Sequence, residues 1–152
     1  MVFEIKIQSS TPLTSENDLE KALITFLYQI GYISKGYDPE TNISKVKESI
    51  PYKLFYDCFL KHPNKMWSIE ELTLKLNTSF PTVYRHLNKL KSLDLLEEEV
   101  IKENNQTRKV HRVRYSNLSK AWNFTEAHIK VAIENYRKSV DHIQKLLEGR
   151  IE

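Results

Sequence analysis

Two hydrophobic patterns define the predicted elements of the N-terminal region. Residues 2–8 alternate apolar and polar side chains, which predicts a half-buried strand. Its inner side is expected to hold Phe3, Ile5 and Ile7. Helical spacing follows and predicts a helix that ends near Gly31 and begins at a cap on Ser15 or Thr14. The apolar side of that helix consists of Leu19, Leu23, Phe26 and Ile30.

The next stretch predicts a linker followed by a helix. Residues 34–47 are mostly polar and include Gly36 and Pro39, so we place a boundary between two units there. Pro51 suits the first turn of a helix, which is expected to run to about His62 because Pro63 follows. Its apolar side consists of Leu54, Phe55, Cys58 and Phe59.

Two capped helices are predicted after that. Ser68 and Glu71 have the spacing of a capping box, and Trp67 is expected to contact Leu72. The helix is short, because the turn-forming residues 77–79 follow it. Ser79 then caps a second helix with Pro81 in its first turn. The buried side of this helix is expected to hold Val83, Leu87 and Leu90, with Asp94 as a possible further member.

The C-terminal part predicts a hairpin and a long helix. Beyond residue 94 the period shortens to two, which favours strands at about 96–102 and 108–115 around the polar tip 103–107. From about Phe124 to Leu147 apolar residues recur at spacings of 4, 3, 4, 3 and 4, the pattern of a heptad seam. The seam consists of Ile129, Ile133, Tyr136, Val140, Ile143 and Leu147.

Composition excludes several classes of protein. With 40% hydrophobic and 11% aromatic residues the 152-residue chain is expected to fold. It has no apolar run long enough to span a membrane and no secretion signal, and with one cysteine, Cys58, it cannot form an internal disulfide. A cytoplasmic protein is therefore expected. The chain has no phosphate-binding glycine motif, and three glycines in all.

Charge is distributed unevenly. Residues 1–48 hold five lysines and seven acidic residues, a net of −2. Residues 100–115 hold five basic residues and one acidic residue, a net of +4. A basic segment on a mixed surface indicates an anionic partner, and a solvated hairpin with clustered bases explains the charge equally well.

A family resemblance rests on residues 67–99, WSIEELTLKLNTSFPTVYRHLNKLKSLDLLEEE, and on the following KENNQTRKVHRVRYS. These resemble the winged helix-turn-helix domain of bacterial and archaeal transcriptional regulators, in the broad group that includes the MarR, ArsR and TrmB types. Similar domains often carry glycine where this chain has Asn77 and Asp94, residues that tolerate a left-handed backbone. The resemblance covers about residues 51–116.

Together with the patterns on either side of it, the resemblance predicts a mainly α fold with a small β component. The expected parts are an N-terminal strand-helix extension and linker (1–48), which lies outside the resemblance, a winged helix-turn-helix DNA-binding domain (49–116) and a C-terminal coiled-coil-like dimerisation helix (117–152). It also implies that the outer face of the helix after Ser79 lies in the major groove of double-stranded DNA. The candidate recognition-helix residues are Ser79, Phe80, Pro81, Thr82, Tyr84, Arg85, Asn88, Lys89 and Lys91.

The chemistry of those side chains agrees with the resemblance. Arg85 has a planar fork that fits guanine or phosphate, and Asn88 has an amide that pairs with adenine. The hairpin is expected to lie along the DNA backbone or minor groove as a wing. The wing candidates are Asn105, Gln106, Thr107, Arg108, Lys109, Arg112 and Arg114.

Each assignment has an alternative. Tyr84 can pack on a neighbouring helix, and His86 is expected at the edge of the core. Arg112 or Arg114 can pair with the acidic residues 97–99 across the hairpin. The seam of the last helix is expected to meet a second copy of the chain, and the alternative is that the N-terminal helix covers it within one chain.

Other functions find less support. Cys58 and His62 lie one helical turn apart, but two ligands do not complete a zinc site, and we expect a buried thiol, no metal, no cofactor and no catalytic residue. A winged-helix protein-interaction or RNA-binding module is the alternative function. Tyr28, Tyr32 and Tyr37 surround the end of the N-terminal unit, yet no residue pattern identifies a small-molecule effector. We predict a homodimeric regulator bound to a near-palindromic site with half-sites about one DNA turn, roughly 34–36 Å, apart.

Overall fold

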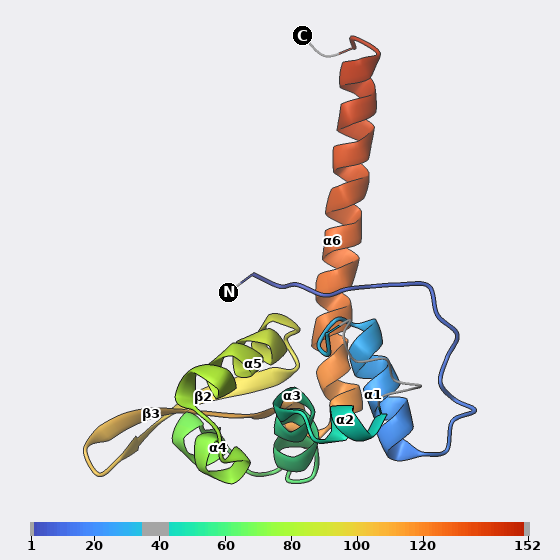
Figure 1. The fold of residues 1–152 in the computed structure, drawn as a ribbon. Helices are drawn as coiled ribbons and strands as arrows, with labels where there is room; N and C mark the ends of the chain where they lie inside the picture. The colour runs from blue at the N-terminus through green and yellow to red at the C-terminus, as the bar shows by residue number, and fades with distance from the viewer. Residues whose placement is uncertain (1, 35–42, 151–152) are drawn as a thin grey trace.

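The computed structural model describes residues 2–34 and 43–150, and it is mostly helical with one small sheet (Figure 1). The predicted mainly α fold with a small β component is confirmed. The described elements are α1 (Leu19–Gln29), α2 (Ile43–Lys47), α3 (Ile50–Lys53), the π-helical η1 (Leu54–Leu60), β1 (Trp67–Ser68), α4 (Ile69–Leu76), α5 (Phe80–Ser92), β2 (Leu96–Glu103), β3 (Gln106–Val113), the 3₁₀ turn η2 (Arg114–Ser116) and α6 (Leu118–Leu147).

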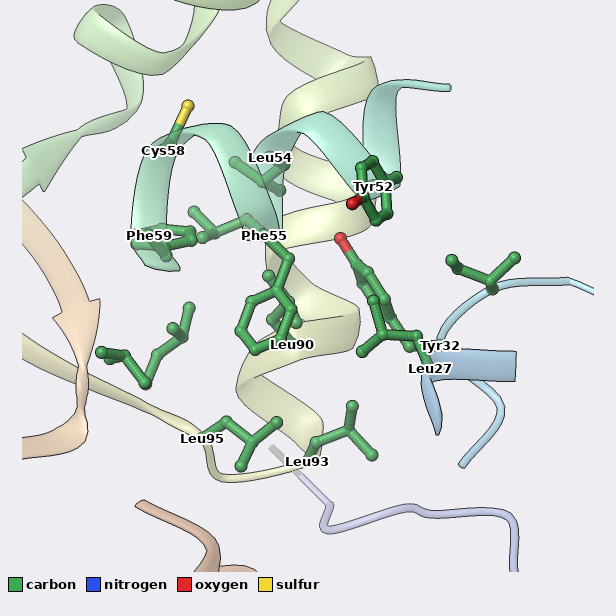
Figure 2. Close-up of a cluster of buried hydrophobic side chains, with 14 of the residues drawn as sticks. Leu27, Tyr32, Tyr52, Leu54, Phe55, Cys58, Phe59, Leu90, Leu93 and Leu95 are labelled. Carbon is green, nitrogen blue, oxygen red and sulfur yellow. The ribbon is translucent and has the colours of Figure 1, made fainter. Parts of the chain in front are cut away.

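One hydrophobic core joins the N-terminal helix to the helices that follow it. Figure 2 shows side chains of α1, α3, η1 and α5 meeting around Tyr32 and Phe55. Both of these rings are buried, and the Tyr32 hydroxyl donates to the carbonyl oxygen of Pro51 at 2.6 Å. Cys58 is buried too, as expected, and burial raises the pKa of its thiol to about 11. Residues on both sides of the predicted boundary near residue 48 therefore share one core.

The N-terminal segment differs from its prediction. Residues 2–8 form no strand, because their backbone follows no sheet edge. Instead the N–H of Glu4 donates to the carbonyl of Ser92 at 3.0 Å, and the N–H of Lys6 donates to that of Ile30 at 3.1 Å. Phe3 stacks on His128 of α6 at 4.6 Å between ring centroids, whereas Ile7, predicted to be inside, is 65% exposed.

Helix α1 begins later than predicted. Its N-cap is Asp18, whose side chain accepts from the N–H of Lys21, and not Ser15 or Thr14. Leu19, predicted to be inside, is exposed in the first turn, and the buried face consists of Leu23, Ile24 and Leu27. Part of the predicted linker is the short helix α2, and Gly36, Tyr37 and Pro39 lie outside the described residues.

The helix pair α4–α5 forms as predicted. Ser68 and Glu71 make the capping box, with 3.2 Å from the N–H of Glu71 to Ser68 Oγ. Ser79 caps α5 by accepting from the N–H of Thr82 at 3.3 Å. Asn77 between the helices has φ of 49°, which confirms the left-handed turn expected there. The buried face of α5 is the predicted one and holds Val83, Leu87 and Leu90.

The hairpin is longer and its turn tighter than predicted. Strands β2 and β3 pair antiparallel up to Glu103 and Gln106, so the connection is the two-residue turn Asn104–Asn105. Both asparagines have positive φ, 52° and 62°, which is the backbone of the favoured two-residue hairpin turns. Strand β1 pairs with the other edge of β3 and gives the sheet order β1-β3-β2.

Helix α6 starts at Leu118, six residues before the predicted start, because Asn117 caps it by accepting from the N–H of Lys120. Its first turns pack on the rest of the molecule, and Thr125 Oγ1 donates to the carbonyl of Leu93 at 2.7 Å. Its upper part rises free of the other elements in Figure 1. The predicted seam residues from Ile133 onwards are exposed, so α1 does not cover them within the chain.

Candidate nucleic-acid interface

The outer face of α5 is the candidate interface, and the buried face positions it. Val83, Leu87 and Leu90 fix the rotation of the helix, which leaves Arg85 exposed and Asn88 partly exposed, one turn apart. Within the described part of the chain no carboxylate pairs with Arg85, whose Nη2 lies 3.5 Å from Nε2 of the adjacent His86. No side-chain hydrogen bond of Asn88 to any described residue occurs. Both side chains therefore keep donors available to a ligand.

The α5 candidates lie on two flanks of the helix. Tyr84, Asn88 and Lys91 face the hairpin and line, with Thr107, Arg108 and Lys109, a hollow of about 190 Å³. Thr82, Arg85 and Lys89 face the other way, toward residues 48–51, beside a hollow of about 470 Å³. The structure thus brings one flank of the recognition helix together with the wing.

Several α5 candidates already have partners. The hydroxyls of Ser79 and Thr82 lie 2.8 Å apart at the start of the helix. Lys89 Nζ donates to the carbonyl oxygen of Tyr32 at 3.1 Å, and Lys91 Nζ lies 2.7 Å from a carboxylate oxygen of Glu98. The rings of Phe80 and Tyr84 pack against each other at 5.6 Å and remain 46% and 45% exposed, and Pro81 is exposed beside them.

His86 lies at the edge of the core, as expected. Burial, with the positive charges of Arg85 and Lys89, lowers the pKa of its imidazole to about 4. Its Nδ1 is buried and has no hydrogen-bond partner among the described residues. The imidazole of His86 is therefore neutral near pH 7, and a negative charge near Arg85 and Lys89 would raise its pKa.

The arginines at the base of the hairpin form ion pairs within the chain. Arg112 faces Glu97 across the strands and bonds to its carboxylate, as the alternative interpretation expected. Arg114 pairs with Asp94 and lies over the Phe124 ring at 4.5 Å. Asp94 has φ of 60° and is not a member of the buried face, because its carboxylate is held outside by Arg114 and by His128 at 2.8 Å.

A second cluster surrounds Glu98, whose role the sequence analysis missed. Lys91, His111 and Lys109 lie at 2.7, 2.9 and 3.7 Å from its carboxylate oxygens. The hydrogen bond from Lys91, with that of His111, lowers the pKa of Glu98 to about 2. Burial lowers the pKa of His111, which Glu98 partly opposes. The register of the hairpin, which places Glu98 opposite His111, is the signal that could have predicted this cluster.

The hairpin is less basic in space than the segment 100–115 suggested. Residues 96–115 together hold five basic and four acidic residues, a net of +1. Arg108, nearer the tip, pairs with Glu103 at 3.2 Å. The turn residues Asn104 and Asn105, and the neighbouring Gln106 and Thr107, are exposed. The predicted wing therefore presents a polar tip and a base whose charges are paired.

Metal and membrane chemistry find no site in the described residues. No group of three or more His, Cys, Asp or Glu side chains within residues 2–34 and 43–150 is placed to hold a metal ion. Within those ranges, no helix has both the length and the hydropathy to cross a membrane. His62 is exposed, whereas Cys58 is buried.

The fold defines the class of the domain. A helix pair with a tight left-handed turn, followed by a two-stranded hairpin that pairs with a short strand before the helix pair, is a winged helix-turn-helix. Helix α5 is its second helix and the β2–β3 hairpin is its wing.

Comparisons with known proteins add the following. No model of a known protein family matches the chain, and no curated protein matches it. Among solved structures, a possible transcriptional regulator from Methanosarcina mazei is 12% identical, with 66% of this chain and 88% of that chain covered and a TM-score of 0.43.

Two structures of MepR from Staphylococcus aureus are also similar. A mutant bound to an oligodeoxyribonucleotide is 18% identical over 67% of this chain and 78% of its own, with a TM-score of 0.36. A mutant from a multidrug-resistant clinical isolate is 14% identical over 90% and 100%, with a TM-score of 0.39. Similarities this distant do not assign a function to this chain.

Proposed function

We propose that the protein is a sequence-specific, double-stranded DNA-binding transcriptional regulator without catalytic activity, acting in the cytoplasm. The observation that carries the proposal is the outer face of α5. Arg85 and Asn88 lie one turn apart on a helix whose opposite face is buried, and neither side chain is engaged by a carboxylate among the described residues.

The geometry supports a division of roles. A helix of the width of α5 enters the major groove, where the Arg85 guanidinium is suited to guanine and the Asn88 amide to adenine. Thr82 and Tyr84 are partly exposed near the start of the helix and supply hydroxyls to the backbone or base edges. The wing, next to the Tyr84 and Asn88 flank, supplies Lys109 and the polar tip to phosphates.

The proposal includes a homodimer formed through α6. The seam residues Ile133, Tyr136, Val140, Ile143 and Leu147 are between 54% and 76% exposed, and no described part of the chain packs on them. Five large apolar side chains in a row on one helix face are costly to leave in water, and a second copy is the simplest cover. A two-fold dimer presents α5 twice, which suits a near-palindromic site.

One feature favours a second candidate function. Phe80 and Tyr84 form an exposed ring pair on the same face. Exposed rings stack on unpaired bases or anchor a protein partner, so an RNA-binding or protein-interaction module is the alternative.

The experiment that tests the proposal is a binding titration over a salt series. The purified full-length chain is titrated with random duplex DNA, duplex RNA and single strands, and its mass is measured by sedimentation on the same sample. Expected results are duplex DNA binding that weakens steeply with salt, and a dimer mass. A preference for RNA or single strands at low salt supports the module instead, and no binding to any nucleic acid rejects the regulator.

A further inference from the structure

The apolar stripe of α6 has a covered lower part. Leu118, Trp122 and Ile129 line, together with α1 and residues 5–13, a cavity of about 610 Å³. The ring of Phe26 in α1 packs edge-on to Trp122, 5.5 Å between centroids. Figure 1 shows α1 beside the base of α6, and the N-terminal segment crossing this helix. The side of α6 that carries the stripe is therefore occupied by the chain itself at the base.

The same stripe continues bare above Ile129. Ile133, Tyr136, Val140, Ile143 and Leu147 extend it, so the exposed seam is continuous with the lining of the cavity. Residues 129–147 span about 27 Å at the rise of an α-helix. If the α6 helix of a second copy packs on this seam, the seams of both copies are buried.

The covered base restricts how a second copy can pack. The axes of two packed helices lie about 8–10 Å apart. Beside the base of α6, the position at that distance is already occupied by α1. A parallel partner continues downward past Ile129 and collides with α1. The α6 helix of an antiparallel partner ends at the partner's Leu147, opposite Ile129, so it does not extend along the base of α6 beside α1.

The seam also has the symmetry that antiparallel packing needs. Its spacings of 4, 3, 4, 3 and 4 are the same in both directions. We propose that a second copy of the chain packs antiparallel on α6, with Ile129 against the partner's Leu147, Ile133 against the partner's Ile143, and Tyr136 against the partner's Val140. The C-terminal end of each α6 then lies next to Ile129, which lines the other copy's cavity.

Flanking charges are compatible with this packing. Near the two-fold axis Arg137 approaches the same residue of the other copy, and its pairing with Asp141 at 3.8 Å offsets part of the repulsion. On the other flank Ala132 and Leu146 come together and extend the apolar contact.

The arrangement sets how far apart the two α5 helices lie along α6. Thr125 bonds to the carbonyl of Leu93, so the end of α5 lies at the level of residue 125. Thirteen residues separate it from the seam's centre at position 138, about 20 Å in each copy. The C-terminal ends of the two α5 helices are then about 40 Å apart along α6.

Cysteine cross-linking in the full chain tests the packing. The variants are Leu147→Cys, Ile129→Cys and the double variant, each oxidised and run without reductant. Only the double variant is expected to form a covalent dimer, because positions 129 and 147 meet across the antiparallel pair and each lies about 27 Å from its own copy. The wild-type chain is the control, since its buried Cys58 thiol has a pKa of about 11 and stays protonated.

Two results overturn the proposal. Cross-linking of Leu147→Cys alone requires a parallel pair, and any other pattern, with circular dichroism showing that the variants are folded, rules out this seam or register. The inference extends the proposed homodimer but not the DNA-binding step. If the double variant cross-links and the chain binds no DNA, the proposed DNA-binding function is rejected and the proposed packing of α6 is supported.

Discussion

The outer face of α5 and the β2–β3 hairpin are both basic in sequence, yet they differ in how their charges are used. In the hairpin Arg108 and Arg112, and Arg114 just after it, each bond to a carboxylate of their own chain, and Lys109 lies 3.7 Å from one. On α5, Arg85 contacts His86 and pairs with no carboxylate of the described residues. Net charge therefore does not identify the cations that are available to an anionic ligand.

The difference follows from the geometry of the two elements. Cross-strand neighbours in an antiparallel ladder meet side chain to side chain, so Glu97 and Glu98 neutralise Arg112 and the Lys109–His111 edge. On α5 the residues that flank Arg85 at helical spacing are Pro81, Thr82, Asn88 and Lys89, none of them acidic. An internally paired wing favours stability of the hairpin, whereas an unpaired arginine favours binding.

The largest expected effect comes from removing the unpaired arginine. Arg85→Ala is expected to weaken specific duplex binding by about 1–3 kcal/mol if the guanidinium contacts a base. Because Arg85 makes no ion pair in the described chain, the unfolding free energy should change by less than about 0.5 kcal/mol. Fluorescence anisotropy with a selected site and a denaturant titration measure the two quantities.

Lys138→Ala is the matched control for Arg85→Ala. It also removes one exposed positive charge, on the upper part of α6 and away from the seam. Its specific affinity should equal that of the wild-type chain at physiological salt. Equal losses in both variants, or no loss in a folded Arg85→Ala, would mean that α5 does not read bases through Arg85.

Local sequence signals predicted the helix-turn-helix, and long-range contacts decided the rest. The caps at Ser68 and Ser79 and the turn at Asn77 depend on neighbours within a few residues, so pattern and composition identified them. The segment 2–8 alternates like a strand, but its backbone partners are Ser92 and Ile30, far away in sequence. No local pattern contains that information.

The candidate site shows the same limit. The register of the buried face of α5 fixed which residues lie outside, so Arg85 and Asn88 were placed correctly on its outer face. The window 100–115 gave a net of +4 because it ended before the acids of the opposite strand. Only the pairing of Glu97 with Arg112 and of Glu98 with His111 shows that this charge is largely neutralised.

A smaller effect separates two cations within the wing. Lys109 is 64% exposed and shares Glu98 with Lys91 and His111. It can therefore bind a phosphate instead, because Glu98 keeps its two other partners. Lys109→Ala is expected to lower the slope of log affinity against log salt by about 0.9, for all sequences alike. Arg112 is 31% exposed and holds Glu97, so Arg112→Ala should leave the slope unchanged and cost about 1 kcal/mol of stability.

The double variant Lys109→Ala with Arg112→Ala tests whether these effects are independent. It should show the slope change of the lysine variant and the stability loss of the arginine variant. A slope lowered by about 1.8 would mean that Arg112 leaves Glu97 for the DNA. In that case the wing is not a neutralised element, and its contrast with α5 disappears in the complex.

The smallest expected effect is a change of protonation at His86, next to Arg85. In the free protein its pKa is about 4, so between this value and about 6.5 the unfolded chain binds a proton that the folded chain does not. Stability should therefore fall as pH decreases through that window.

A phosphate near Arg85 and Lys89 offsets the positive charges that lower the pKa, and it should raise the pKa of His86 by about one pH unit. The bound state then holds more protons than the free state, so affinity increases as pH falls below about 6. Imidazole NMR signals, assigned with His86→Gln, give the midpoint with and without duplex DNA. A midpoint that stays near 4 in the complex would show that no phosphate lies on this flank, and it would leave base contact as the remaining role for Arg85.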